Sequence, residues 1–280
     1  MAQCDGMRPD MNQLIPSHDL LWIVLDSLRY DVAQQEMSAG RTPHLARLAG
    51  TWERRHTPGS FTLPAHAAFF AGFLPTPADP AADRQRLFAA RFAGSESTGP
   101  GTKVFETADI VSGLRAEGFR SICVGGVGFF SGRTPLSSML PGYFDESHWR
   151  EEFGVTSKQA PAAQTAFAAS LVSAADPAAK LMLFMNVAAI HQPNYFYLRD
   201  SGPDDLASHA AALRAVDAAL PVLLRAWAQR GRPLFWIVCS DHGTAYGEDG
   251  FTGHRAGVDS IWTVPYAHGI LKKSAWRETL

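Results

Sequence analysis

The chain has 280 residues and a mass of 30.4 kDa, and 25 Lys and Arg residues against 27 Asp and Glu residues leave a formal charge of −2. This balance gives no electrostatic reason to expect nucleic acid or an anionic membrane as a partner. Hydrophobic residues make up 46% of the chain, which excludes a disordered polar protein. The longest aliphatic run, Leu20–Leu25, is far shorter than the about 20 residues of a membrane span.

The three cysteines, Cys4, Cys123 and Cys239, are odd in number and far apart in the sequence. A disulfide framework is therefore not expected, and a reducing, cytoplasmic compartment is favoured. The N-terminal stretch lacks a charged region followed by an apolar one, so it does not read as a secretory signal. We expect residues 1–12 to form a flexible extension and residues 13–280 to form one domain.

Buried strands are predicted where short aliphatic runs end at polar or Gly/Pro residues. The four runs are Leu20–Leu25, Ser121–Val124, Leu181–Val187 and Leu234–Cys239. Helical patterns precede the last three, over Thr107–Glu117, Pro161–Ala175 and Asp204–Arg230, the third expected to be kinked or split at Pro221. This alternation predicts an α/β fold, a doubly wound and mainly parallel sheet with helices on both faces.

Two long connections interrupt this pattern. Pro75–Thr102 is rich in Pro, Ala, Gly and Ser, and we interpret it as a surface excursion. Gly125–Gly154 is rich in aromatic residues, which favours an ordered, packed loop.

Candidate metal ligands follow the predicted strands. Asp26 follows the first, His191 the third, and Asp241 and His242 the fourth, with His254 further along a glycine-rich loop. Ligands bind outside the carboxyl ends of the strands in open α/β sheets, and carboxylates with imidazoles suit a divalent metal. A structural role is also open: the aspartates could cap a turn or a helix, and a histidine beside a strand could be a satisfied core group.

A nucleophile candidate precedes another predicted helix. Pro64 suits a first helical turn that Ala65–Ala71 continue, which places Thr62 just before the helix. The unpaired N–H groups and the dipole of a helix N-terminus favour an anion such as phosphate or sulfate. A Thr hydroxyl needs a base or a metal to become a nucleophile. Equally, Thr62 or Ser60 could serve only as an N-cap.

Taken together, these segments resemble the alkaline phosphatase superfamily and, within it, the sulfatase-like branch of stand-alone bacterial hydrolases. Five motifs occur in the order found in that branch, along most of the chain. They are WIVLDSLRYD (Trp22–Asp31), TPHLARLA (Thr42–Ala49), SFTLPAHAAFFAGFLP (Ser60–Pro75), NVAAIHQPN (Asn186–Asn194) and SDHGTAYGEDGFTGH (Ser240–His254).

The resemblance implies an alkaline phosphatase-like catalytic domain and assigns roles to individual residues. It implies that Asp26, Asp241 and His242 bind one divalent metal, zinc or manganese. Thr62 would be the metal-activated nucleophile that forms a covalent phospho-Thr intermediate. His191 and His254 fall where relatives bind a second metal or the anionic oxygens of the substrate.

The chain also departs from the family pattern. Thr62 stands where sulfatases need Cys or Ser for formylglycine, and His66 replaces their Arg. Ser27 stands where a second Asp is usual, and Val187 and Ala189 stand where two-metal enzymes carry an Asp. We therefore expect one firm metal site and a doubtful second one. We expect no counterpart of the C-terminal subdomain of full-length sulfatases.

We expect a metal-dependent hydrolase of small anionic phosphate esters, with diesters or phosphonate esters favoured. Three further functions stay open: a sulfate ester hydrolase without formylglycine, a phosphoryl transferase or isomerase, and a non-catalytic metal- or ligand-binding relative. His66, Arg29 and Arg255 are candidate substrate contacts, although each arginine could be a solvated or structural charge.

Overall fold

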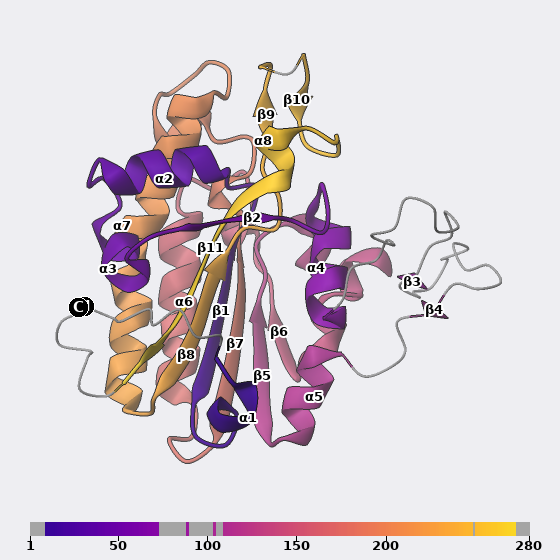
Figure 1. Ribbon diagram of the computed structural model, residues 1–280, viewed down its shortest axis with the longest axis vertical. Helices are drawn as coiled ribbons and strands as arrows, with labels where there is room; N and C mark the ends of the chain where they lie inside the picture. Colours follow the sequence, from indigo (N-terminus) through magenta and orange to yellow (C-terminus); the bar gives the residue numbers. More distant parts are fainter. Residues whose placement is uncertain (1–8, 73–87, 90–102, 105–108, 249, 273–280) are drawn as a thin grey trace.

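The computed structural model describes residues 9–72, 88–89, 103–104, 109–248 and 250–272. Its centre is a sheet of seven strands in the order β2-β11-β8-β1-β7-β5-β6 (Figure 1). The strands are β1 (Asp19–Leu25), β2 (Glu53–His56), β5 (Phe119–Val124), β6 (Glu146–His148), β7 (Lys180–Val187), β8 (Leu234–Cys239) and β11 (Thr263–Leu271). Strands β8, β1, β7, β5 and β6 are parallel, whereas β11 runs antiparallel to both β8 and β2.

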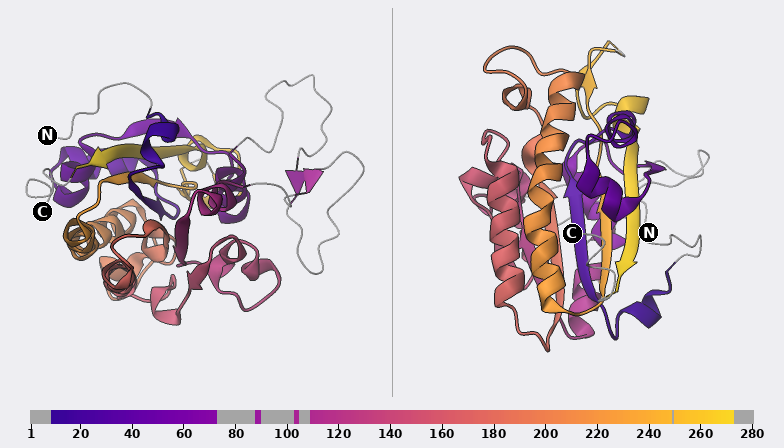
Figure 2. Two further views of the ribbon diagram at one scale, coloured as in Figure 1. Left: turned by 90° about the horizontal axis from the view of Figure 1, so that it is seen from below. Right: turned by 90° about the vertical axis from the view of Figure 1, so that its left-hand side faces the viewer.

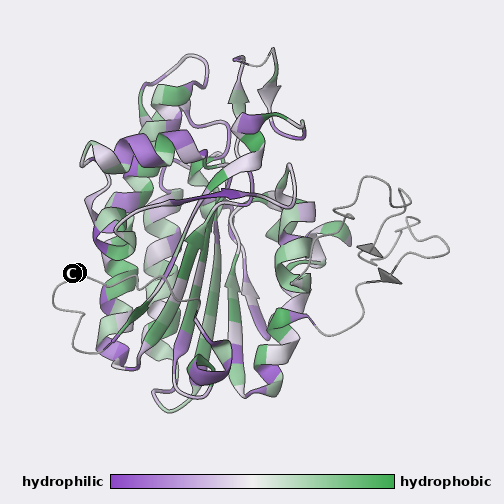
Figure 3. Ribbon diagram, in the orientation of Figure 1, coloured by the Kyte–Doolittle hydropathy of each residue, from purple (hydrophilic) through white to green (hydrophobic). Residues whose placement is uncertain are grey.

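The four strands predicted from aliphatic runs are confirmed, and they are neighbours in the middle of the sheet. Figure 3 shows that these central strands are the most hydrophobic part of the ribbon. The aliphatic runs did not predict β2, β6 or β11. Strand β11 carries Pro265, His268 and Gly269, so it lacks the aliphatic run that marks a strand buried on both faces.

Helices cover both faces of the sheet (Figure 2), as predicted for a doubly wound fold. One face is covered by α2 (Tyr30–Ser38), α3 (Pro43–Ala49), α6 (Ala160–Ala174) and α7 (Leu206–Arg230). The other is covered in part by α1 (Met11–Leu14), α4 (Thr62–Ala71) and α5 (Ile110–Ala116). Short elements complete the described chain: β3 (Phe88–Ala89), β4 (Lys103–Val104), β9 (Ala245–Tyr246), β10 (Thr252–Gly253) and α8 (Asp259–Trp262).

Helix α7 runs unbroken through Pro221, so the predicted split there is wrong. The apolar face that includes Leu213, Leu220 and Leu224 is buried against the sheet and α6, and this packing outweighs the one backbone hydrogen bond that proline removes. By length and composition α7 could also cross a membrane, but its buried face is that of a core helix in a globular domain.

The segments outside the regular elements differ in how far the structure describes them. Residues 1–8 lie outside the described residues, whereas Met11 packs against the core under α4 and α5. The predicted excursion Pro75–Thr102 also lies outside them, apart from β3. The second long connection is ordered and packed as predicted, since Phe130, Phe144 and Phe153 are buried.

Candidate metal centre

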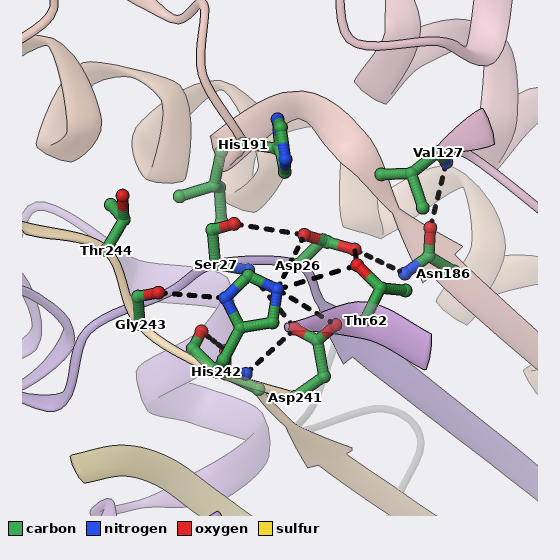
Figure 4. Close-up of polar contacts among 12 residues, drawn as sticks. Asp26, Ser27, Thr62, Val127, Asn186, His191, Asp241, His242, Gly243 and Thr244 are labelled. Atoms are coloured by element: carbon green, nitrogen blue, oxygen red, sulfur yellow. Dashed lines mark hydrogen bonds and ion pairs between the residues drawn. The ribbon is translucent and has the colours of Figure 1, made fainter. Parts of the chain in front are cut away.

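Asp26 lies directly after β1, at the carboxyl edge of the sheet, and is fully buried. Its Oδ1 accepts a hydrogen bond of 3.0 Å from the Ser27 hydroxyl. Its Oδ2 accepts one of 2.9 Å from the side-chain nitrogen of Asn186 and one of 3.3 Å from the Thr62 hydroxyl (Figure 4). Strands β1 and β7 are paired in parallel, so both residues reach the site from neighbouring strand ends.

Asp241 follows β8, on the other side of β1, and is also fully buried. Its Oδ1 accepts hydrogen bonds from the backbone N–H groups of Ser27 at 3.2 Å and His242 at 3.0 Å. Ser27 makes this contact from a left-handed backbone conformation, with φ of 67°. This conformation is uncommon for a non-glycine residue, and strained residues of this kind cluster at active and ligand-binding sites. The Oδ2 of Asp241 has no hydrogen-bond partner although it is buried.

His242 presents its Nε2 lone pair to these carboxylates. Its Nδ1 lies 2.8 Å from the Gly243 carbonyl, which can only accept, so Nδ1 carries the proton and Nε2 does not. Nε2 lies 3.6 Å from Asp26 Oδ1 and 3.5 Å from Asp241 Oδ2. It is also 3.5 Å from the Thr62 hydroxyl (Figure 4).

Thr62 is the first residue of α4, not the residue before the helix as predicted. Phe61 is the N-cap and makes no side-chain capping bond. The hydroxyl of Thr62 faces Asp26 and His242 instead of a backbone N–H, which excludes a role as a plain N-cap. The side chain is buried, with 2% of its surface exposed.

The donor atoms of Asp26, Asp241 and His242 lie within 4.8 Å of one another, a spacing that suits one metal ion. Burial and then the negative charge of Asp26 raise the pKa of Asp241 well above its usual range. No Lys or Arg within the described ranges forms an ion pair with either carboxylate. Two buried carboxylates, an orphaned oxygen and an imidazole lone pair are a donor set that fits a divalent cation.

His191 and His254 lie beside this group. The ring of His254 stacks on that of His242, with the two centroids 4.8 Å apart. The centroid of the His191 ring lies 5.1 Å from that of His254. Burial, and then the neighbouring His242 and His191, lower the pKa of His254 to about 4. In the part of the chain that the structure describes, no carboxylate joins these two histidines to form a second group of three metal ligands.

His66 is wholly buried, one helical turn after Thr62. Its Nδ1 donates a hydrogen bond of 2.8 Å to the Thr62 carbonyl and lies 3.6 Å from Asp241 Oδ2. The rings of Phe70, Phe130 and Phe184 surround it, and its Nε2 has no partner. The structure therefore places His66 in the wall that supports the site rather than on an open surface.

The two candidate arginines differ. Arg29 is buried and pairs with Asp31 at 2.6 Å and with Glu248, and its guanidinium also donates to the Thr244 carbonyl. Its charge is thus compensated by protein carboxylates. Arg255 is exposed and its guanidinium lies over the ring of Phe61, the residue directly before Thr62.

Asn186 and Ser27 were not predicted from the sequence to be functional residues. Asn186 interrupts the otherwise apolar strand β7 and is fully buried, and a polar residue in such a run was a usable signal. Its Oδ1 accepts a hydrogen bond of 3.0 Å from the Val127 backbone N–H, which ties the loop after β5 to the site. The left-handed conformation of Ser27 had no sequence signal.

A separate cavity of about 640 Å³ lies beside α4, against β1, β8 and β11. Aromatic side chains, among them Trp22, Phe69 and Tyr266, line it together with Thr57. The Thr57 hydroxyl donates to the Asp241 carbonyl, so a residue that lines the cavity contacts a candidate metal ligand. None of the three candidate ligands lines this cavity itself.

The sequence matches no family model. No curated protein matches it either. Solved structures do match in fold. The chain resembles the C-terminal periplasmic domain of EcEptC from Escherichia coli in complex with Zn, at 11% identity and a TM-score of 0.62, over 94% of this chain and 75% of that one.

Two further structures agree. The corresponding periplasmic domain of phosphoethanolamine transferase EptC from Campylobacter jejuni matches at 10% identity and a TM-score of 0.62, over 93% of this chain and 81% of that one. A protein of the alkaline phosphatase superfamily from Vibrio parahaemolyticus matches at 15% identity and a TM-score of 0.56, over 92% of this chain and 60% of that one. The chain therefore has the alkaline phosphatase-like fold that the motifs predicted.

Proposed function

We propose that this chain is a metal-dependent enzyme that cleaves phosphate esters with Thr62 as its nucleophile. The observation that carries the proposal is the convergence of the Thr62 hydroxyl, two buried carboxylates and the Nε2 lone pair of His242 at one edge of the sheet. A buried hydroxyl that bonds a carboxylate, at a helix N-terminus, is placed for attack on an anionic group.

Each residue of the site has its own role in the proposed reaction. A divalent cation bound by Asp26, Asp241 and His242 would supply positive charge that acidifies the Thr62 hydroxyl and neutralises phosphoryl oxygens. Asp26 holds the hydroxyl through its Oδ2, and Asn186 holds Asp26 in turn. The stacked His254 and its neighbour His191 form the side of the site open to a substrate.

The reaction has two balanced steps. The Thr62 oxygen forms a bond to phosphorus, the bond from phosphorus to the leaving oxygen breaks, and the leaving group departs as an alcohol with one proton. Water or a second alcohol then attacks the phospho-Thr, which restores the hydroxyl and releases the phosphoryl product.

Whether water or an alcohol is the acceptor separates the two candidate functions. Hydrolysis is the primary proposal, with phosphate diesters or phosphonate esters as substrates. Transfer to an alcohol is the second candidate, because one of the structural relatives is a phosphoethanolamine transferase. The same covalent intermediate serves both, so comparing product formation with and without added alcohols distinguishes them.

A sulfatase reaction and a purely non-catalytic binding role have less support. Thr62 cannot be converted to formylglycine, so a sulfatase reaction would need a different mechanism. A non-catalytic binding protein has no need for a buried hydroxyl aimed at the metal ligands.

The test is hydrolysis of chromogenic phosphate monoesters, phosphate diesters, phosphonate esters and sulfate esters with zinc, manganese, magnesium or calcium added. We expect turnover of a phosphorus ester by the wild type, loss of at least about a thousandfold in Thr62→Ala, and partial activity in Thr62→Ser. Mass spectrometry should detect a phosphoryl group on Thr62. Equal zinc content in wild type and Thr62→Ala is the control, and turnover that survives Thr62→Ala would disprove the nucleophile.

We also propose the periplasm, rather than the cytoplasm expected from the cysteines, as the compartment. The support is that the EptC relatives are periplasmic domains. The two described cysteines, Cys123 and Cys239, are free and buried, so they are compatible with either compartment. Fractionation of cells that produce the protein at native level tests this directly.

A further inference from the structure

Arg255 is fixed beside the nucleophile by its own backbone and side chain. Its N–H donates a hydrogen bond of 2.8 Å to the Ser60 carbonyl, and its guanidinium carbon lies 4.9 Å from the centroid of the Phe61 ring. Its φ of 82° is a left-handed conformation that costs a non-glycine residue free energy. The loop after His254 and the segment that leads into Thr62 are thus held together at this arginine.

The guanidinium of Arg255 forms no ion pair with a carboxylate in the described part of the chain. Arg29, in contrast, is paired with Asp31 and Glu248.

The charges of the site can be counted. The carboxylates of Asp26 and Asp241 carry two negative charges when a metal is bound, which cancel those of a divalent cation. Among the described arginines beside the centre, Arg29 is paired with Asp31 and Glu248, whereas the permanent positive charge of Arg255 has no carboxylate partner.

The surroundings of Arg255 are aromatic. The ring of Phe61 lies 6.4 Å from that of Phe129, and both side chains are partly exposed. One cation beside two aromatic rings complements a substrate with one negative charge and an apolar organic group on each side of phosphorus.

We propose that Arg255 recognises the anionic oxygen of the substrate and makes this site selective for monoanionic esters, namely phosphate diesters and phosphonate monoesters, over dianionic phosphate monoesters. This inference rests on the proposed function and names its substrate class. It assigns to Arg255 a contact that Arg29 and His66, both buried and engaged with protein groups, do not offer.

The test measures binding separately from turnover. Zinc-loaded Thr62→Ala protein is titrated calorimetrically with bis(4-nitrophenyl) phosphate and with 4-nitrophenyl phosphate. We expect the diester to bind more tightly than the monoester. Adding Arg255→Ala should weaken diester binding about tenfold, the size of one charge-assisted hydrogen bond, and Arg255→Lys should restore part of it.

Arg150→Ala is the matched control, because the Arg150 guanidinium likewise stacks on an aromatic ring, 4.2 Å from the Phe167 centroid, and is not part of the site. It should leave both affinities unchanged. The inference is overturned if Arg255→Ala binds the diester as tightly as its parent, if the monoester binds more tightly, or if neither ester binds. Failure of the proposed function looks different: the wild type turns over no ester, whatever the binding experiment shows.

Discussion

The side-chain nitrogen of Asn186 lies 2.9 Å from Oδ2 of Asp26, and both residues are fully buried. They occupy the ends of neighbouring parallel strands, and the other end of the Asn186 amide accepts the Val127 backbone N–H. One side chain therefore links three consecutive strand ends, those of β5, β7 and β1, to the candidate metal centre.

Replacing Asn186 should weaken both the fold and the metal site. Asn186→Ala leaves the Val127 N–H unpaired and deprives Asp26 of a donor, so we expect a loss of about 2–3 kcal/mol in stability. Zinc affinity should fall about 10–100-fold, as for other residues that orient ligands. Urea unfolding and competition titration with a zinc chelator measure the two effects.

Gln164→Met is the control for Asn186→Ala. Gln164 is equally buried and donates to the Asn186 backbone carbonyl, but it does not contact Asp26. It should lower stability without lowering zinc affinity. Equal zinc affinity in Asn186→Ala and wild type would contradict the role assigned to this side chain.

Asp241→Asn should separate metal binding from folding. Oδ2 of Asp241 has no hydrogen-bond partner, and the Asp241 carboxylate lies beside that of Asp26. An amide at this position therefore removes the repulsion between the two carboxylates, and no hydrogen bond to Oδ2 is lost. We expect the metal-free variant to be at least as stable as the wild type. Zinc at about 1,000 times its Kd should stabilise the wild type by about 4 kcal/mol and the variant by much less.

Asp26→Asn is the informative comparison for that experiment. Both oxygens of Asp26 accept hydrogen bonds, so an amide at this position loses one acceptor and forces its neighbours to rearrange, which should destabilise the metal-free protein. If zinc raises the melting temperature of Asp241→Asn as much as that of the wild type, the assignment of Asp241 as a ligand is wrong.

Gly243→Ala should disrupt the loop that carries His242. A Cβ at Gly243 would lie 2.0 Å from the Ser260 carbonyl oxygen, and the Gly243 N–H is already bonded to the Ile261 carbonyl at 2.8 Å. The loop cannot move without losing that bond, so we expect a loss of about 3 kcal/mol. Chemical denaturation provides the measurement. Gly128→Ala, where nothing lies within 4 Å of the new Cβ, should be nearly neutral.

His209 should make the protein sensitive to mild acid. Burial, and then the charge of Arg29, lower the pKa of His209 to about 3. The unfolded chain binds this proton near pH 6.5 and the folded one does not, so stability is complete above pH 6.5 and falls as the pH drops from there toward 3. At pH 5 the cost is about 2 kcal/mol.

His209→Gln tests this contribution, because glutamine can hydrogen-bond to Tyr246 but does not titrate. Unfolding of both proteins in urea with a metal chelator, at pH 7 and pH 5, measures it. The variant should lose about 2 kcal/mol less than the wild type between the two pH values. Identical losses would show that His209 is not the group responsible.

The sequence predicted much of this protein because its signals are local. Continuous aliphatic runs mark the four central strands, since only a strand covered on both faces can bury such a run. Strand ends in a parallel sheet meet at one edge, which is why Asp26, His191, Asp241 and His242 could be grouped from the sequence. The family resemblance singled out Asp26, Asp241 and His242 as ligands of one metal, and the structure brings these three together.

Only the tertiary structure decided the features that depend on long-range packing. Strand β11 mixes polar and apolar residues, so its sequence does not mark it as a strand. Its antiparallel pairing with β8 holds it in the extended conformation. Pro221 does not break α7, because its neighbours bury a long apolar face. The two arginines looked alike in sequence, but Asp31 and Glu248 neutralise Arg29, whereas Arg255 has no carboxylate partner among the described residues. Charge pairing depends on which side chains the fold brings together.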